Sequence, residues 1–197
     1  MYLYHYFEKA KGPFLSIMDL SYDQAFKELS NIQEKNQNLV NPRKKWFLST
    51  RRELEYKVRN LAIEKGSKPV RLSPFYMTLG KCDEMSTWFE VPAVIKIHIS
   101  EFNLDELSFT YGDMFPVFNP DLNDGKEYRE NVYNFEEIIN IIDKYGYPEC
   151  IPHNLRDGIH PVDAPINHFL KYVEAHIWSD DVVSKYRDEW LTTNSAV

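Results

Sequence analysis

Two ionisable residues near opposite ends of the sequence have types and neighbours that could support chemistry. His5 lies within the aromatic segment 2–7, and Glu174 lies within the alternating segment 172–178. Alternation places residues 172, 174, 176 and 178 on one face of a strand and small apolar residues on the other. The Glu174 face, a carboxylate among aromatics, suits either a solvated sheet surface or a cleft. Taken alone, His5 suits a core histidine and Glu174 a surface residue.

Arg51 and Arg52 lie next to each other in a charged segment that is expected to be helical. The same charged stretch continues with Glu53, Glu55 and Lys57. Charged residues four positions apart on a helix usually form solvated ion pairs. The pattern by itself therefore predicts an exposed helix face.

A proline-containing segment, residues 147–168, is expected to be a long loop, and long loops are often functional. It carries histidine and aspartate side chains that could bind a metal. These residues are His153, Asp157, His160, Asp163 and His168. Their spacing matches no standard site, so we predict that no metal is bound. A metal-dependent hydrolase centred on His153, His160 and Asp163 remains an alternative.

Several standard catalytic motifs are absent from the sequence. It contains no GxxxxGK[ST], GxGxxG, GxSxG or HExxH pattern. The local signatures of nucleotide-triphosphate, dinucleotide-fold, serine-hydrolase and zincin sites are therefore missing. Cys82 and Cys150 are far apart and form no CxxC motif, so we expect neither a cysteine zinc site nor a disulfide, and a reducing compartment.

The elements that must position these residues can be predicted from caps and periodicity. Capping-box spacing at Ser21 predicts a helix over residues 22–35, and Asn41-Pro42 predicts the start of a second helix that runs to Gly66. Asn134 predicts a helix that ends at Gly146, and residues 179–181 open a last one. Strands are expected at residues 2–7, 74–79, 94–99, 107–110 and 172–178.

The order of these elements partly separates helices from strands, which favours an α+β fold over a doubly wound sheet. We expect one domain over residues 1–197, with a central, mostly antiparallel split sheet and N-terminal helices. With 43% hydrophobic residues, the chain can build a packed core. It shows neither a signal-peptide pattern nor a long apolar run, so we expect a cytoplasmic protein that does not enter a membrane.

Short motifs in the same order resemble the ADP-ribosyltransferase superfamily, with a closer likeness to DarT-type DNA ADP-ribosyltransferase toxins. That family has a Tyr-His strand, a Pro-Phe-Tyr strand, a Phe-Thr-Asp-Gly turn and a late strand with the catalytic glutamate. The matching pieces here are Tyr4-His5, Pro74-Phe75-Tyr76, Phe109-Thr110-Tyr111-Gly112-Asp113 and Val173-Glu174-Ala175. Tyr111 stands where the family has aspartate, and residues 78–82 replace its Arg-Ser-Pro segment.

The resemblance implies NAD as substrate and an ADP-ribosyltransferase or NAD glycohydrolase activity without a metal. Glu174 would be catalytic, with Arg51 or Arg52 as the catalytic arginine. The resemblance further implies that NAD is bound by His5, Tyr6 and Tyr76. The acceptor would be a nucleic acid or a protein, and a neutralising antitoxin would be a partner.

The other reading is a noncatalytic interaction module. It predicts that His5 and Glu174 do not meet in one cleft. The net charge of −7 bears on both readings, because it opposes indiscriminate binding to polyphosphate. A nucleic-acid acceptor would need a local basic patch such as residues 43–59.

Overall fold

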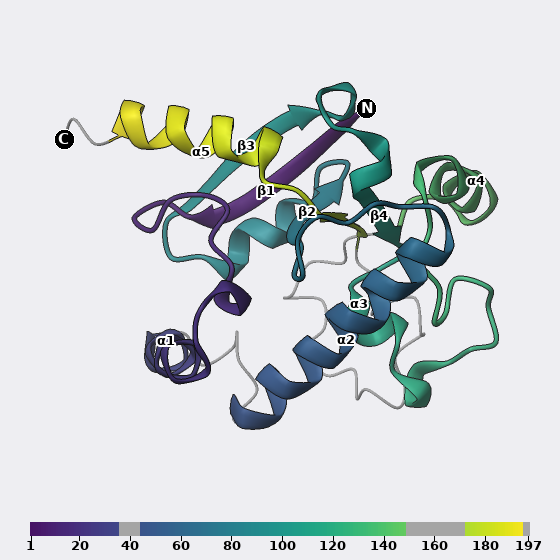
Figure 1. Ribbon diagram of the computed structural model, residues 1–197, viewed down its shortest axis with the longest axis horizontal. Helices are drawn as coiled ribbons and strands as arrows, with labels where there is room; N and C mark the ends of the chain where they lie inside the picture. The colour runs from purple at the N-terminus through teal and green to yellow at the C-terminus, as the bar shows by residue number, and fades with distance from the viewer. Residues whose placement is uncertain (36–43, 149–171, 195–197) are drawn as a thin grey trace.

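The computed structural model describes residues 1–35, 44–148 and 172–194 (Figure 1). Most of the predicted long loop, with its five candidate metal ligands, lies outside these ranges, as does the predicted helix start at Asn41-Pro42. The predicted α+β class is confirmed. The structure combines an antiparallel sheet of five strands with several helices.

The sheet has the strand order β3-β1-β2-β5-β4, and every neighbouring pair is antiparallel. The strands are β1 (Tyr2–Glu8), β2 (Phe75–Leu79), β3 (Pro92–His98), β4 (Leu107–Thr110) and β5 (Val173–Ile177). These bounds agree with the predicted strands to within two residues. The last strand of the chain, β5, lies between β2 and β4, so residues from distant segments meet at the middle of the sheet.

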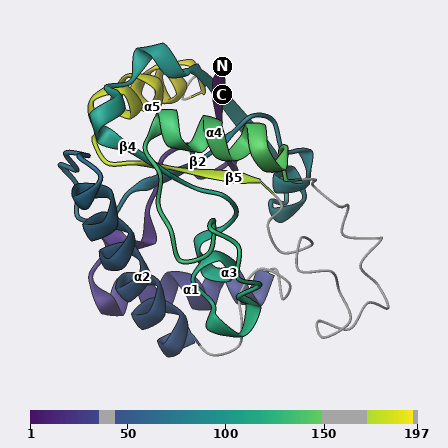
Figure 2. The same ribbon diagram turned by 90° about the vertical axis from the view of Figure 1, so that its right-hand side faces the viewer.

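Helices cover both faces of the sheet (Figure 2). The α-helices are α1 (Tyr22–Lys35), α2 (Lys44–Glu64), α3 (Met114–Val117), α4 (Phe135–Tyr145) and α5 (Asp181–Asn194). Short 3-10 turns connect them: η1 (Ile17–Asp19), η2 (Asp83–Trp88), η3 (Ile99–Glu101), η4 (Leu104–Glu106) and η5 (Pro120–Leu122). Figure 2 shows α1, α2 and α3 on one side of the sheet and α4 and α5 on the other.

Two of the predicted caps are present. The Asn134 side chain accepts the Glu137 N–H, and the Glu137 carboxylate accepts the Asn134 N–H, which completes a capping box at the start of α4. Ser21 and Gln24 exchange the same pair of bonds before α1. Gly146 ends α4 with a φ of 79°, a conformation that glycine adopts without strain.

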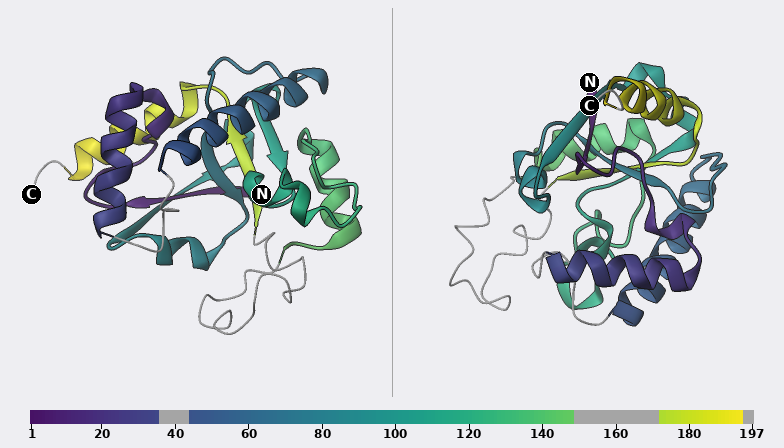
Figure 3. Two further views of the ribbon diagram at one scale, coloured as in Figure 1. Left: turned by 90° about the horizontal axis from the view of Figure 1, so that it is seen from below. Right: turned by 90° about the vertical axis from the view of Figure 1, so that its left-hand side faces the viewer.

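Strand register separates an apolar face of the sheet from a polar one. Met77 pairs with Ala175, and this face packs against α4 and α5, where Ile138 and Val183 are completely buried. On the same face, α5 lies next to β1 (Figures 1 and 3). The Trp190 ring of α5 meets the Phe7 ring of β1 edge-on, with the ring centres 4.9 Å apart. The opposite face carries Glu174 and its neighbours toward α2.

The pairing between β1 and β2 is much shorter than the others. It consists of two registered pairs, at Leu3 and Tyr4, whereas β1 pairs with β3 over seven. Beyond Tyr4, a side chain replaces the backbone pairing: His5 Nδ1 lies 3.0 Å from the backbone carbonyl oxygen of Tyr76 and forms a hydrogen bond with it. The sheet is therefore held between these two central strands partly by a side chain.

Cys82 is disulfide-bonded. The prediction that the cysteines form no disulfide is therefore wrong, and the reducing compartment inferred from it loses that support. Spacing along the sequence could not reveal the bond, because a disulfide depends on proximity in the fold. Within the described part of the chain, no helix is both long and apolar enough to cross a bilayer.

Candidate functional site

Glu174 lies at the centre of the sheet, on the face that α2 covers. Its neighbours in register are Thr78 on β2 and Thr110 on β4. The residue is only 5% exposed, and every residue of β5 is buried. Both faces of this strand are thus core, although alternation in the sequence suggested that the Glu174 face was a surface or a cleft.

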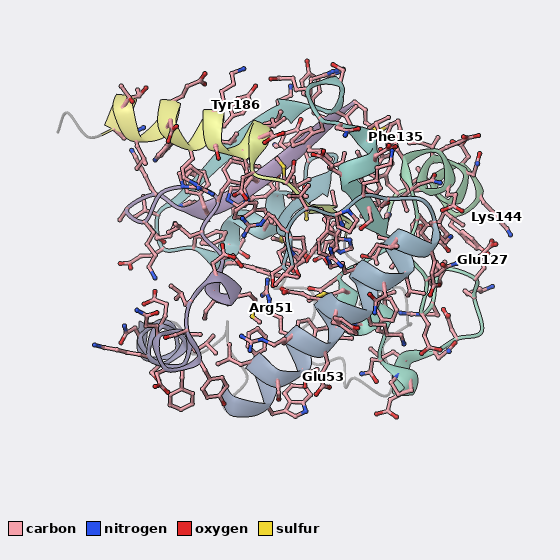
Figure 4. The ribbon with its side chains drawn as sticks, in the orientation of Figure 1. Arg51, Glu53, Glu127, Phe135, Lys144 and Tyr186 are labelled. Carbon is pink, nitrogen blue, oxygen red and sulfur yellow. The ribbon has the colours of Figure 1, made fainter. Side chains whose placement is uncertain are left out.

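Helix α2 supplies a cation and a second carboxylate next to the sheet. Arg51 Nε donates to Glu55 Oε1 at 2.9 Å, and the Tyr76 hydroxyl donates to the same oxygen at 2.7 Å. The Arg51 guanidinium also lies 4.7 Å from the centre of the Tyr76 ring. Figure 4 shows Arg51 on the side of α2 that faces the sheet, whereas Glu53 lies on the opposite side. These three residues connect α2 to β2.

The turn after β4 approaches Glu174 from another side. The Met114 N–H donates to Glu174 Oε1 at 3.3 Å, and the Tyr172 hydroxyl donates to Asp113 Oδ2 at 3.1 Å. Asp113 also caps α3 through the Phe115 N–H. The carboxylate of Glu174 is therefore enclosed by β2, β5, α2 and the start of α3.

Burial dominates the electrostatics of this cluster. It raises the pKa of Glu174 to about 8, although the Arg51 charge and the Met114 N–H act in the opposite direction. Burial likewise raises the pKa of Tyr76 well above its ordinary value. Burial opposes the charge of Arg51, but Tyr76 and the two carboxylates raise its pKa overall, so Arg51 stays a cation. Glu174 can thus exchange a proton close to neutral pH.

The structure brings together three of the residues singled out from the sequence: Arg51, Tyr76 and Glu174. Arg52 does not join them, because it lies on an exposed position of α2. Of the two candidate arginines, Arg51 is therefore the one next to Glu174.

His5 is engaged elsewhere. Besides the bond to Tyr76, its Nε2 accepts the Phe14 N–H at 2.9 Å, and its ring stacks on Phe14 at 4.1 Å. The register of Leu3 with Leu79 places His5 on the opposite face of the sheet from Glu174. Burial lowers the pKa of His5 to about 4. Both ring nitrogens serve the backbone, as in a structural core histidine.

Tyr6 is also held by a backbone group. Its hydroxyl accepts the Cys82 N–H at 2.9 Å. Burial raises the pKa of Tyr6, and the charges that act on it are those of Asp83 and Lys81 rather than the Glu174 cluster. Tyr6 and His5 therefore lie apart from the cluster that contains Glu174.

Sequence reasoning noted Glu55, Asp113 and His176 without assigning them to the site. The signal for Glu55 was its spacing of four residues from Arg51, which suggested a solvated pair, yet Glu55 is 1% exposed. His176 shared a predicted face with Glu174, and its Nε2 lies 3.1 Å from Glu174 Oε1. Ser108 and Trp178 carried no signal beyond their places in or beside predicted strands.

No group of three or more potential metal-binding side chains occurs within the described ranges. The five histidines and aspartates of the predicted loop, and with them the alternative metal centre, lie outside the described residues. Comparison of the chain with models of known families, with curated proteins and with solved structures gave no match.

Proposed function

We propose that the cluster around Glu174 is the catalytic centre of an enzyme that cleaves the nicotinamide–ribose bond of NAD. It transfers the ADP-ribose to an acceptor or, as an NAD glycohydrolase, to water. One observation carries the proposal. The resemblance selects three residues from separate segments of the sequence, and the fold brings them together. These residues are Arg51, Tyr76 and Glu174.

The chemistry of the cluster suits this bond cleavage. Loss of nicotinamide builds positive charge on the ribose, and a carboxylate held beside the ribose stabilises that charge. In its ionised form Glu174 provides this carboxylate in a site of low dielectric. Arg51 stays charged and can bind the pyrophosphate or polarise the acceptor. The new bond to the ribose is formed by the acceptor or, in the glycohydrolase reaction, by water, and nicotinamide is the leaving group.

Exposure determines the side from which NAD can approach. The Arg51 side chain is 21% exposed, whereas those of Glu55 and Glu174 are almost fully buried. Arg51 also covers the Tyr76 ring. The resemblance names Tyr76 as an NAD-binding residue, and stacking of nicotinamide on its ring requires Arg51 to move off the ring when NAD binds.

The short pairing between β1 and β2 supports the finer expectation of a split, ADP-ribosyltransferase-like sheet. The proposal gives no role to His5 and Tyr6, whose polar groups are already bonded to backbone partners. It retains a nucleic acid or a protein as the acceptor and an antitoxin as a partner. The proposal also keeps a cytoplasmic location, where a disulfide such as that of Cys82 is uncommon.

The test is nicotinamide release from NAD by the purified protein, with and without DNA, RNA or protein acceptors. We expect Glu174→Gln and Arg51→Ala to lower the rate by about 100-fold or more, because each removes a charge from the centre. In the reaction without a nucleic-acid acceptor, Arg52→Ala is the matched control, since it removes the neighbouring, exposed arginine, and should retain the rate. Absence of release by the folded wild-type protein under all conditions would refute the proposal.

A noncatalytic interaction module is the second candidate. The observation in its favour is that His5 and Glu174 lie on opposite faces of the sheet, as that reading predicts. In this case the cluster is a buried polar network that fixes α2 on the sheet. Unchanged thermal stability in millimolar NAD, together with no nicotinamide release, would favour this candidate.

A further inference from the structure

Behind Glu174 lies a chain of hydrogen bonds that the proposed reaction does not use. Trp178 Nε1 donates to Ser108 Oγ at 2.8 Å. Ser108 Oγ lies 3.1 Å from His176 Nδ1, and His176 Nε2 lies 3.1 Å from Glu174 Oε1. Trp178, Ser108 and His176 are each 0% exposed. These hydrogen bonds therefore run from Trp178, just past the end of β5, to the Glu174 carboxylate through residues without contact with solvent.

The direction of these bonds follows from the donors available. The indole N–H can only donate, so the Ser108 oxygen accepts at that contact. Among the described residues, the remaining hydrogen-bond partner of the Ser108 hydroxyl is His176. The hydroxyl hydrogen then points at Nδ1, which leaves the hydrogen of the neutral ring on Nε2. His176 consequently donates to Glu174.

Strand pairing holds this arrangement in place. Ser108 and Tyr76 are the register neighbours of His176 on β4 and β2, and Glu174 lies two residues before it on the same face. The Tyr76 ring meets the His176 ring edge-on at 5.8 Å. Burial lowers the pKa of His176 to about 3, so the ring is neutral at physiological pH. A neutral histidine ring that is fixed by its neighbours can donate a hydrogen bond to a carboxylate but cannot form an ion pair with it.

We propose that Trp178, Ser108 and His176 form a positioning relay that fixes Glu174 through its Oε1 and so orients the carboxylate toward the ribose of NAD. The proposal rests on the proposed function for the identity of the substrate. With His176 Nε2 and the Met114 N–H both donating to Oε1, the carboxylate cannot rotate freely. Groups that orient metal ligands from behind in this way typically change activity by 10- to 100-fold when removed, and we expect an effect of the same order here.

Other charged and titratable groups also face Glu174, and the test must separate the relay from them. They are Arg51 and Glu55 on α2, Tyr76 on β2, Asp113 before α3 and Tyr172 before β5. Ser108→Ala leaves all of them in place and removes only the hydroxyl. Its matched control is Ser67→Ala, which removes another buried hydroxyl, one that donates to the Leu107 carbonyl of the same strand β4.

The first measurement does not depend on activity. Long-range ¹H–¹⁵N NMR of the histidine rings should show His176 with its hydrogen on Nε2 in the wild type and in Ser67→Ala. Ser108→Ala should shift the ring toward the other tautomer and raise the pKa of Glu174 in a ¹³C-carboxyl titration. A wild-type His176 with its hydrogen on Nδ1, or a folded Ser108→Ala variant with unchanged tautomer and Glu174 titration, would overturn the relay even if NAD is cleaved.

The second measurement is the pH profile of nicotinamide release. Ser108→Ala should lower the rate about 10-fold and move the acid limb to higher pH, whereas Ser67→Ala should leave the profile in place. His176→Gln, whose amide can still donate to Oε1, should retain more activity than His176→Phe at equal thermal stability. Equal loss in these two variants would contradict the relay. A wild type without activity would reject the proposed function, and the NMR result would still decide on the relay.

Discussion

Glu174 is a carboxylate whose burial couples protonation to stability. Its pKa is about 8 in the folded protein and near 4.5 in the unfolded chain. Between these values the native state binds more protons than the unfolded state, so the free energy of unfolding falls as the pH rises. The contribution of Glu174 is complete below about pH 4.5 and is lost as the pH rises through about 8.

We therefore expect Glu174→Gln to remove this dependence. From about pH 6.5 to 8, the free energy of unfolding of the wild type should fall relative to that of the variant by up to about 1.4 kcal/mol per pH unit. Urea unfolding at four pH values measures both proteins. His5 cancels in the difference, whereas His176 contacts Glu174, so the comparison is read above about pH 6.5, where the lowered pKa values of both histidines no longer affect stability. Parallel pH curves would contradict a raised pKa at Glu174.

At the scale of single residues, sequence alternation predicted correctly which side chains share a face. It placed positions 172, 174, 176 and 178 together, and Glu174 and His176 do bond each other. It could not predict that this face is buried, because the covering helix α2 comes from a segment more than a hundred residues earlier. For the same reason, Arg51 could not be distinguished from Arg52 until α2 was placed on the sheet.

At the scale of elements, one hydroxyl connects α2 to the sheet inside the cluster. The Tyr76 hydroxyl donates to Glu55 Oε1 on α2. Tyr76→Phe leaves the ring in place but deprives a buried carboxylate of a donor, which should cost about 1–3 kcal/mol in unfolding free energy. Chemical denaturation measures this loss, and hydrogen exchange should become faster in α2.

The control for this prediction lies on the same helix. Tyr56 is 67% exposed, so Tyr56→Phe makes the same chemical change where no buried partner is lost. Its unfolding free energy should stay within about 0.5 kcal/mol of the wild type. Equal effects of the two substitutions would mean that the hydroxyl of Tyr76 does not anchor α2.

The sequence predicted the ends of a helix correctly where both an N-terminal cap and a C-terminal glycine were present. The capping box at Asn134 and the glycine at Gly146 set both ends of α4, and the helix forms as predicted. Strand order did not follow from local signals. The insertion of β5 between β2 and β4 depends on pairing between distant segments, which no turn or cap encodes. The disulfide of Cys82 was missed for the same physical reason.

At the scale of the whole molecule, charge restricts how a nucleic-acid acceptor could bind. The net charge of −7 repels polyphosphate, but α2 carries six basic and three acidic residues. Arg51 is turned toward the sheet and paired, whereas Arg52 is exposed. If DNA or RNA is the acceptor, we expect its phosphates to contact the outer side of α2.

Charge reversal tests this placement. Arg52→Glu and Lys185→Glu change the net charge equally, but Lys185 lies on α5, across the sheet from α2 (Figure 2). Arg52→Glu should abolish the binding of a labelled single-stranded oligonucleotide in fluorescence anisotropy, whereas Lys185→Glu should weaken it only slightly. Wild-type binding should also fall steeply between about 50 and 200 mM salt, because phosphate contacts release counterions. Equal effects of the two reversals, or no binding at low salt, would remove α2 as a nucleic-acid surface and favour a protein acceptor.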